Sequence, residues 1–502
     1  MIKVFCDQKE KDLKNFWGHI VFHPTNAIED DWGKQYLDKI AEDGAAKTIR
    51  VYSMFEESVT LDENGEMKFD WSKNDERLDY LISKGFNLMI TYGFIPVWLS
   101  AEQDPELTKP RYKDVIFYRS YPSDYEKWGE ICRAYTEHLT ERYGEELVST
   151  WWLNCYNEPD LGHFFYLNAE DDYVSRATEY CKLYDAFEKA VTSVSRNFII
   201  GACSLSESRT HLPFLEFFLK HIKKHGRKFD FLSYHAYGSA PIFLDSGIRP
   251  LDARVPYNGS CAIKKIADMC GFKGIPLICD EWGAATSGYY GIEKTRKLEF
   301  RENEVFAAYY TKMLTHYDES DIDLDLLMIC LSGQHDLPGD FLGQRNFFTK
   351  SFYPKPIFNA HVLANKLGEE KLYHYTTLTF RPEDNISVMP TKHADGHMSH
   401  LLTYADSAFS IDLPPCEFTI DFEGLDKEYK VVKYLIDRNH ANCYTKFCEL
   451  GRPQDASEEI KEEIRKAGAL VPEDVGTVSP ENNTLTLTME NNAVVLLELI
   501  PA

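Results

Sequence analysis

Two carboxylic acids, each at the end of an apolar segment, are the residues of this sequence that could do chemistry together. Glu158 lies in the tripeptide Asn157-Glu158-Pro159, which closes the apolar run 148–156, and Glu281 closes the run 276–281. Cleavage of a glycosidic bond needs such a pair: one carboxyl group protonates the leaving oxygen, and the other attacks or stabilises the anomeric carbon. The pair therefore indicates glycoside hydrolysis.

The elements that must position these acids follow a βα pattern. Short apolar runs alternate with longer amphipathic stretches, as in a parallel sheet or barrel. We expect strands over eight segments: 16–23, 47–54, 87–95, 148–156, 197–203, 230–236, 276–281 and 325–331. The clearest helix has one apolar face with spacings of three and four, made of Ala177, Tyr180, Tyr184, Phe187, Val191 and Val194.

Eight strands with intervening helices predict an α/β fold, a (β/α)8 TIM barrel that forms the catalytic domain over residues 13–350. A doubly wound open sheet is the alternative interpretation. The sequence contains no Gly-rich nucleotide-binding motif that would support that alternative.

The pattern changes after residue 350, where many segments alternate apolar with polar residues. We expect strands over 371–380, 385–389, 397–404, 416–422, 429–436, 484–489 and 493–500, and one charged helix over 457–467. This pattern predicts a C-terminal β-sandwich accessory domain over residues 351–502. Residues 1–12 could add a strand to it.

A barrel of this kind carries its active site at the carboxyl ends of its strands. Glu158 ends the fourth expected strand and Glu281 the seventh, so both should reach that face. Either one alone would be read as a surface acid among the 80 acidic residues. As a pair, Glu158 is the expected acid/base and Glu281 the expected nucleophile. Glu158 must then be protonated in the free enzyme, held so partly by the charge of Glu281.

Neighbouring residues have expected supporting roles. Asn157 could hydrogen-bond a sugar hydroxyl next to the anomeric carbon. Arg50, near the end of the second expected strand, could hold Glu281 ionised, and a structural salt bridge in the barrel wall is the competing interpretation. Asp280 should point away from Glu281, because side chains alternate along a strand.

Four more residues are candidates for substrate binding. His235 and Tyr237 share one face of the sixth expected strand and could donate to the nucleophile or to sugar hydroxyls. A satisfied core histidine is the competing interpretation of His235. Trp98 and Trp282 are candidate stacking platforms for a sugar ring, with core packing as the alternative.

Composition argues against several other functions. The net charge is −25, from 55 basic and 80 acidic residues, and nucleic-acid binding needs a basic surface. We expect no membrane association and a cytoplasmic location, since no long apolar window and no signal peptide are visible. The twelve cysteines form no C-x-x-C pair and predict buried thiols. No metal-binding motif is present, so we expect neither a metal nor another cofactor.

Three motifs resemble those of glycoside hydrolase family 39, a family of retaining (β/α)8 enzymes in clan A. They are Trp152-x4-Asn157-Glu158-Pro159-Asp160, Ser233-x-His235-Ala-Tyr237 and Asp280-Glu281-Trp282. Segments 341–360 and 436–453 also resemble the family, so that the likeness covers nearly the whole chain. The resemblance implies the same roles for Glu158 and Glu281, and its characterised members include β-xylosidases and α-L-iduronidases.

Two strand ends differ from those of the family's xylosidases. Those enzymes tend to carry glycines where this chain has Phe22-His23-Pro24, and an aromatic residue where it has Leu331-Ser-Gly-Gln334. His23 and Gln334 are therefore candidate substrate-binding residues. The segment Asp160-Leu-Gly-His163 is closer to the iduronidases, yet iduronate needs a cation for its carboxylate and the sequence identifies none.

We therefore expect a retaining exo-glycosidase that removes a terminal sugar from small oligosaccharides, with β-xylosidase as the first choice. A glycosidase for an arabinose-, galactose- or uronate-containing glycan is the alternative within this class. A non-catalytic sugar-binding barrel is the alternative from another class. The expected partner is an oligosaccharide or glycoside substrate, and the resemblance is compatible with a homo-oligomer.

Overall fold

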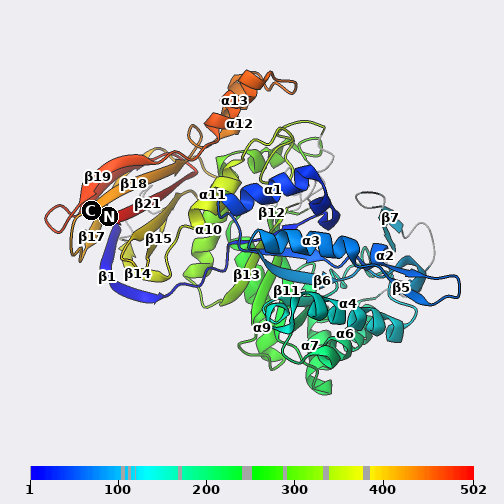
Figure 1. The fold of residues 1–502 in the computed structure, drawn as a ribbon. Coiled ribbons are helices and arrows are strands. Elements are labelled where there is room, and N and C mark those ends of the chain that lie inside the picture. Colours follow the sequence, from blue (N-terminus) through cyan, green and yellow to red (C-terminus); the bar gives the residue numbers. More distant parts are fainter. Residues whose placement is uncertain are drawn as a thin grey trace.

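The main body of the protein is a closed barrel of eight parallel strands (Figure 1). The computed structural model describes residues 2–102, 108–110, 113, 115–118, 120–167, 172–239, 251–286, 291–331, 338–376 and 385–502. The barrel strands are β2 (His19–Phe22), β3 (Thr48–Tyr52), β6 (Asn87–Tyr92), β9 (Trp152–Cys155), β10 (Ile199–Leu205), β11 (Phe231–Ser239), β12 (Leu277–Ala285) and β13 (Leu324–Leu331). All eight predicted strands are present, and the predicted (β/α)8 barrel is confirmed.

Helices cover the outside of the barrel (Figure 1). The longer ones are α1 (Asp31–Glu42), α3 (Ser72–Ser83), α4 (Tyr125–Tyr143), α6 (Tyr173–Val194), α7 (Leu212–His225), α9 (Arg254–Met269) and α10 (Glu304–Asp318). Helix α6 shows why these segments are helical: the Asp172 side chain accepts hydrogen bonds from the first-turn amides, and the predicted apolar face is buried except for the half-buried Val194 at its end. Shorter elements at the loops are α2 (Phe55–Ser58), α5 (Glu145–Val148), β4 (Val59–Leu61), β5 (Met67–Phe69), β7 (Thr108–Pro110) and β8 (Ile116–Tyr118).

Two of the differences between predicted and observed strand limits affect the site. Strand β9 begins at Trp152 rather than at residue 148, because residues 145–148 form helix α5. Strand β12 continues to Ala285, four residues beyond its predicted end. Glu281 therefore lies within a strand, and not at the point where the strand stops.

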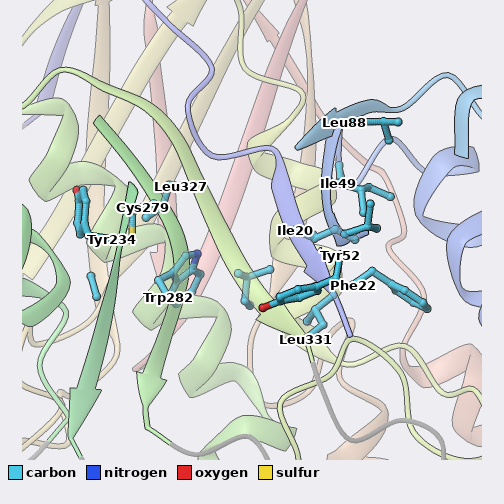
Figure 2. Packing of buried hydrophobic residues seen from close by; sticks show 14 of the residues in the cluster. Ile20, Phe22, Ile49, Tyr52, Leu88, Tyr234, Cys279, Trp282, Leu327 and Leu331 are labelled. Atoms are coloured by element: carbon cyan, nitrogen blue, oxygen red, sulfur yellow. The ribbon is translucent and has the colours of Figure 1, made fainter. Parts of the chain in front are cut away.

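Strand residues divide between two apolar layers, as the alternation of side chains requires. The outward layer packs against the helices and includes Ile20, Ile49, Leu88 and Leu327 (Figure 2). The inward layer fills the barrel and comprises Val21, Met89, Phe231, Ile278, Leu326, Met328 and Cys330. The barrel is thus a packed core, and the site sits above it.

A second sheet of nine strands, mostly antiparallel, follows the barrel (Figure 1). Its order is β19-β18-β21-β16-β15-β14-β1-β17-β20. The strands are β1 (Ile2–Asp12), β14 (Glu370–Thr376), β15 (Ile386–Lys392), β16 (Met398–Tyr404), β17 (Cys416–Glu423), β18 (Tyr429–Ile436), β19 (Glu473–Val478), β20 (Thr484–Met489) and β21 (Ala493–Pro501). They bury one side against a separate apolar cluster. The predicted C-terminal β domain is confirmed.

The N-terminal strand belongs to this second sheet. Strand β1 pairs antiparallel with β14 and parallel with β17. Strand β19 was not expected, because its residues Glu-Asp-Val-Gly-Thr-Val lack an apolar alternation and only Val478 is buried. Three helices accompany the sheet: α11 (Pro356–Ala364), α12 (Cys443–Glu449) and the predicted charged helix α13 (Glu458–Ala467), which Ser457 caps.

Helix α10 joins the barrel to the sheet. Lys312 Nζ donates to the carbonyl oxygen of Asn385 at 2.8 Å, and the Thr403 hydroxyl donates to that of Thr311 at 2.7 Å. Asp318, at the end of the helix, pairs with Lys371 at 2.5 Å. All twelve cysteines are free. Within the described part of the chain, no helix has both the length and the apolarity to cross a bilayer.

Candidate active site

The two glutamates converge at the carboxyl end of the barrel. Glu158 comes three residues after β9, and Glu281 lies on β12. A carboxylate oxygen of Glu158, one of Glu281 and a ring nitrogen of His235 all lie within 4.8 Å of one another. A separation of about 5–5.5 Å between the two carboxyl groups characterises retaining glycosidases, whereas inverting enzymes need more room for a water molecule.

A bulge in β12 brings a third carboxylate into the barrel. On the neighbouring strand, Tyr234 pairs with Cys279 and the next residue, His235, pairs with Glu281, so that Asp280 is passed over. The expectation that Asp280 points away from the site is therefore wrong. Its side chain is fully buried, and Oδ2 accepts a hydrogen bond from Ser204 Oγ at 2.6 Å.

Glu281 is surrounded by donors and cations. Arg50 Nη1 lies 2.8 Å from Oε1, and the Tyr237 hydroxyl donates to Oε2 at 2.6 Å. His235 Nδ1 is 3.6 Å from Oε2. Burial alone would raise the pKa of Glu281, but the charges of His235 and Arg50 and the Tyr237 hydrogen bond lower it to about 2. Glu281 is therefore an anion at neutral pH, and Arg50 contacts it directly.

Glu158 has the opposite electrostatic environment. Burial and the nearby charge of Glu281 raise the pKa of its carboxyl group, although His235 opposes this shift. Its Oε1 lies 2.9 Å from His235 Nδ1. The backbone at Glu158 is left-handed, with φ of 48°, and its N–H donates to the carbonyl oxygen of Ser204 at 3.2 Å. This unusual backbone turns the carboxyl group back over the barrel.

His235 lies between the glutamates. Burial would lower the pKa of its imidazole, but Glu281, Asp280 and Glu158 together raise it to about 9. The ring is fully buried. At neutral pH it is a cation that faces both candidate catalytic groups.

Asn157 is oriented by two donors. Arg50 Nη2 and the Tyr52 hydroxyl donate to the amide oxygen at 2.6 and 3.1 Å. Within the described ranges the amide nitrogen of Asn157 has no hydrogen bond. The arrangement presents an N–H donor beside Glu158, as binding of a sugar hydroxyl requires. The ring of His23 lies 6.0 Å from that of Tyr52, so His23 is at the edge of this group.

The two predicted tryptophan platforms have different positions. The prediction that Trp282 is a stacking platform for a sugar is wrong. Its side chain is fully buried, points outward from β12 and stacks on Tyr310 of α10 at 5.6 Å, which leaves no face for a sugar. Trp98 is half-buried, and its indole N–H donates to the carbonyl oxygen of Val59. Within the described ranges, no hydrogen bond joins Trp98 to either glutamate. Gln334 lies outside the described residues.

Sequence reasoning missed two residues of the site and gave a third the wrong direction. Tyr52 shares a strand face with Arg50, two positions away, so side-chain alternation could have identified it. Arg345 is buried with its guanidinium 4.8 Å from the centre of the Tyr237 ring, and its charge also lowers the pKa of Glu281. It follows β13 in the loop that resembles the family, which was the available signal. Asp280 was identified and given the wrong direction.

The trio of Glu158, His235 and Glu281 has the spacing of a metal site. Its chemistry does not suit one. A ligating histidine must be neutral, whereas the carboxylates raise the pKa of His235 to about 9. Arg50, 2.8 Å from Glu281, adds a further positive charge.

A (β/α)8 barrel that brings an ionised glutamate and a second glutamate of raised pKa together at its carboxyl end defines the class of retaining glycoside hydrolases. The chain belongs to family 39 of the glycosyl hydrolases, which residues 1–478 match. The resemblance of the motifs is thereby confirmed.

Two β-xylosidases are similar to this chain along almost their entire length. A β-xylosidase from Caldicellulosiruptor saccharolyticus is 24% identical over 499 residues, 95% of this chain and 93% of that protein. A β-xylosidase from Geobacillus stearothermophilus is 23% identical over 532 residues, 99% of this chain and 95% of that protein.

Solved structures share the fold. A monomeric β-xylosidase from Caulobacter crescentus CB15 has a TM-score of 0.81 at 19% identity, covering 100% of this chain and 99% of that one. A bacterial orthologue of human α-L-iduronidase has a TM-score of 0.79 at 16% identity, covering 100% and 84%. The fold is therefore common to enzymes named for different sugars.

Proposed function

We propose that the protein is an exo-acting β-xylosidase in which Glu158 is the acid/base and Glu281 the nucleophile. The observation that carries the assignment of roles is the electrostatic asymmetry of the two carboxyl groups. Burial raises the pKa of Glu158, whereas cations and a phenol lower that of Glu281 to about 2. The choice of xylose is supported by the two relatives named β-xylosidase.

The proposed reaction has two displacements. Glu158 gives its proton to the glycosidic oxygen while a carboxylate oxygen of Glu281 attacks the anomeric carbon, so that the C–O bond breaks and a glycosyl-enzyme ester forms. Glu158, now ionised, takes a proton from water, which attacks the same carbon and releases Glu281 as a carboxylate. Two inversions restore the original configuration.

The surroundings of the glutamates fit both half-reactions. When Glu281 becomes an ester it loses its charge, and the pKa of Glu158 then falls because one cause of its elevation has gone. The same group can thus serve first as an acid and then as a base. Asn157, with its amide oxygen held by Arg50 and Tyr52, is the proposed donor or partner for the neighbouring sugar hydroxyl.

A second candidate is a glycosidase for a uronate-containing glycan. Recognition of a uronate carboxylate requires a cation, and Arg345 supplies one beside Tyr237, close enough to affect Glu281. This observation favours a uronate over arabinose or galactose as the alternative sugar.

Release of 4-nitrophenol from a panel of aryl glycosides tests the proposal. The panel contains the β-D-xyloside, the α-L-arabinoside, the β-D-galactoside and an α-L-iduronide. We expect turnover of the xyloside that Glu281→Ala abolishes while the circular dichroism spectrum stays unchanged. Turnover of the iduronide alone would select the second candidate. Binding of xylose without hydrolysis of any glycoside would select the sugar-binding barrel instead.

A further inference from the structure

Asp280 is a buried carboxylate that contacts two cations of the site, Arg50 and His235. Its Oδ2 lies 3.3 Å from Arg50 Nη2 and accepts the Ser204 hydrogen bond. Its Oδ1 lies 3.7 Å from His235 Nε2. Neither Oδ1 nor Nε2 has a hydrogen-bond partner among the described residues. These two buried polar atoms therefore face each other at ion-pair distance.

Asp280 supplies negative charge to a buried cluster that holds three cations. Glu158 and Glu281 face Nδ1 of His235, Asp280 faces Nε2, the Tyr237 ring stands 6.2 Å away on the same strand, Arg50 lies behind the carboxylates, and Arg345 lies beside Tyr237. Burial raises the pKa of Asp280, and the charges of Arg50 and His235 and the Ser204 hydrogen bond oppose this shift. Without the charge of Asp280 the buried cluster would carry a net positive charge, which is costly in a low-dielectric interior.

We propose that Asp280 is a positioning residue of the reaction, which keeps His235 doubly protonated and oriented with its Nδ1–H toward the catalytic carboxyl groups. This inference rests on the roles proposed for Glu158 and Glu281. Asp280 itself touches neither carboxyl group and acts through the imidazole.

The orientation has a chemical consequence at Glu158. Because Nδ1–H donates to Oε1, the acidic proton of Glu158 must be on Oε2, which is then the oxygen that serves the leaving group. A neutral His235 with its only proton on Nε2 would instead accept at Nδ1 and draw the proton of Glu158 to Oε1. Asp280 thus decides which oxygen of the acid is protonated.

Nitrogen NMR of the imidazoles tests the proposal without reliance on turnover. In the wild-type protein, labelled with ¹⁵N-histidine and assigned by comparison with His235→Gln, we expect both ring nitrogens of His235 to be protonated at pH 7. In Asp280→Asn, whose amide can donate to Nε2, we expect the titration midpoint of His235 to fall by about 1–3 pH units. The alkaline limb of the kcat/KM profile, which reports Glu158, should move to higher pH, because a neutral His235 no longer lowers the pKa of Glu158.

Asp318→Asn is the matched control. Asp318 is also a buried aspartate with cationic partners, Lys371 and Lys11, but it belongs to the contact between barrel and sheet. It should lower stability and leave the titration of His235 unchanged. A neutral His235 in the wild-type protein at pH 7, or an unchanged midpoint in Asp280→Asn, would overturn the proposal. Failure of the proposed function would appear separately, as retained activity in Glu281→Ala.

Discussion

Tyr237 donates its phenolic hydrogen to Glu281 across 2.6 Å, from the strand next to the one that carries the glutamate. In the β11–β12 pairing, Tyr237 is opposite Gly283, two residues beyond Glu281. A Cβ atom at position 283 would lie 3.1 Å from the Tyr237 ring. Glycine therefore gives the ring room to lean over β12, and the phenol reaches Glu281 because its neighbour has no side chain.

Replacement of Tyr237 should remove a hydrogen bond that stabilises the carboxylate of Glu281. In Tyr237→Phe the loss of a hydrogen bond to a charged group should lower kcat/KM by about 10–100-fold. The pKa of Glu281 should rise, because the phenol is one of the groups that lower it, so the acid limb of the kcat/KM profile should move to higher pH. Tyr234→Phe, which loses a hydrogen bond to Ser260 on the outer side of the same strand, is the control. An acid limb that does not move would contradict the assignment of Glu281.

Glu158→Ala should make the rate depend strongly on the leaving group. A leaving group that needs no proton, such as 2,4-dinitrophenolate, should retain most of the rate of its first step. A poor leaving group should lose about 10²–10⁴-fold, which is the usual contribution of a general acid. The alkaline limb of the pH profile should disappear with the carboxyl group. Glu281→Ala should be inactive on both substrates, and equal losses on both in Glu158→Ala would argue against its role as the acid.

Arg50→Met should damage stability and chemistry together. The substitution removes the guanidinium from Asp280 and Glu281 and leaves His235 as the cation between them, which should lower the free energy of unfolding by about 3–5 kcal/mol. Arg77→Met is matched to it, because Arg77 is equally buried and pairs with Glu29 and Glu57 away from the site. Both variants should melt earlier in calorimetry. Only Arg50→Met should raise the acid limb of the kcat/KM profile.

Buried neutral histidines should make the fold acid-sensitive. Burial lowers the pKa of His19, His361 and His400 to about 3 in the folded state, against an ordinary value of 6.5. Below pH 6.5 the unfolded chain binds protons that the folded protein does not, so stability falls as the pH drops from 6.5 toward 3. Each group should cost about 1.4 kcal/mol per pH unit in that window. His235 acts in the opposite sense: its stabilisation is complete below pH 6.5 and is lost as the pH rises through about 9.

Urea unfolding at several pH values between 7 and 4 checks this expectation. His400→Leu should remove roughly a third of the slope contributed by the three buried histidines. His225→Leu, at the exposed end of α7, should leave the slope unchanged. Equal slopes in the two variants would show that the buried imidazoles do not govern acid unfolding.

The periodicity of the sequence predicted most of the fold, because alternation and helical spacing report directly on burial. Strand order also predicted that Glu158, Glu281 and Arg50 reach the same end of the barrel. The left-handed backbone at Glu158 and the bulge in β12, which set the directions of the two glutamates, leave no signal in the periodicity. It failed at Asp280, since a bulge is one extra residue that shifts the alternation and has no compositional mark. The prediction for Trp282 was wrong for a related reason. Strand β12 continues past Glu281, so Trp282 still follows the strand alternation and its side chain points outward to α10. Arg345 was missed because it lies in a loop after β13, and the periodicity of the sequence does not predict that this loop folds back over the site.

Strand β1 also constrains how the protein is made. It precedes the barrel in the chain, yet its partners are β14 and β17, which follow the entire barrel in the sequence. The barrel segments are therefore synthesised while β1 has no strand to pair with. Closing the second sheet is a long-range, late step of folding. A chain interrupted before residue 416 would keep one edge of β1 open. Such an edge is a template for pairing with another chain, so premature termination of translation should yield aggregates rather than a free catalytic barrel.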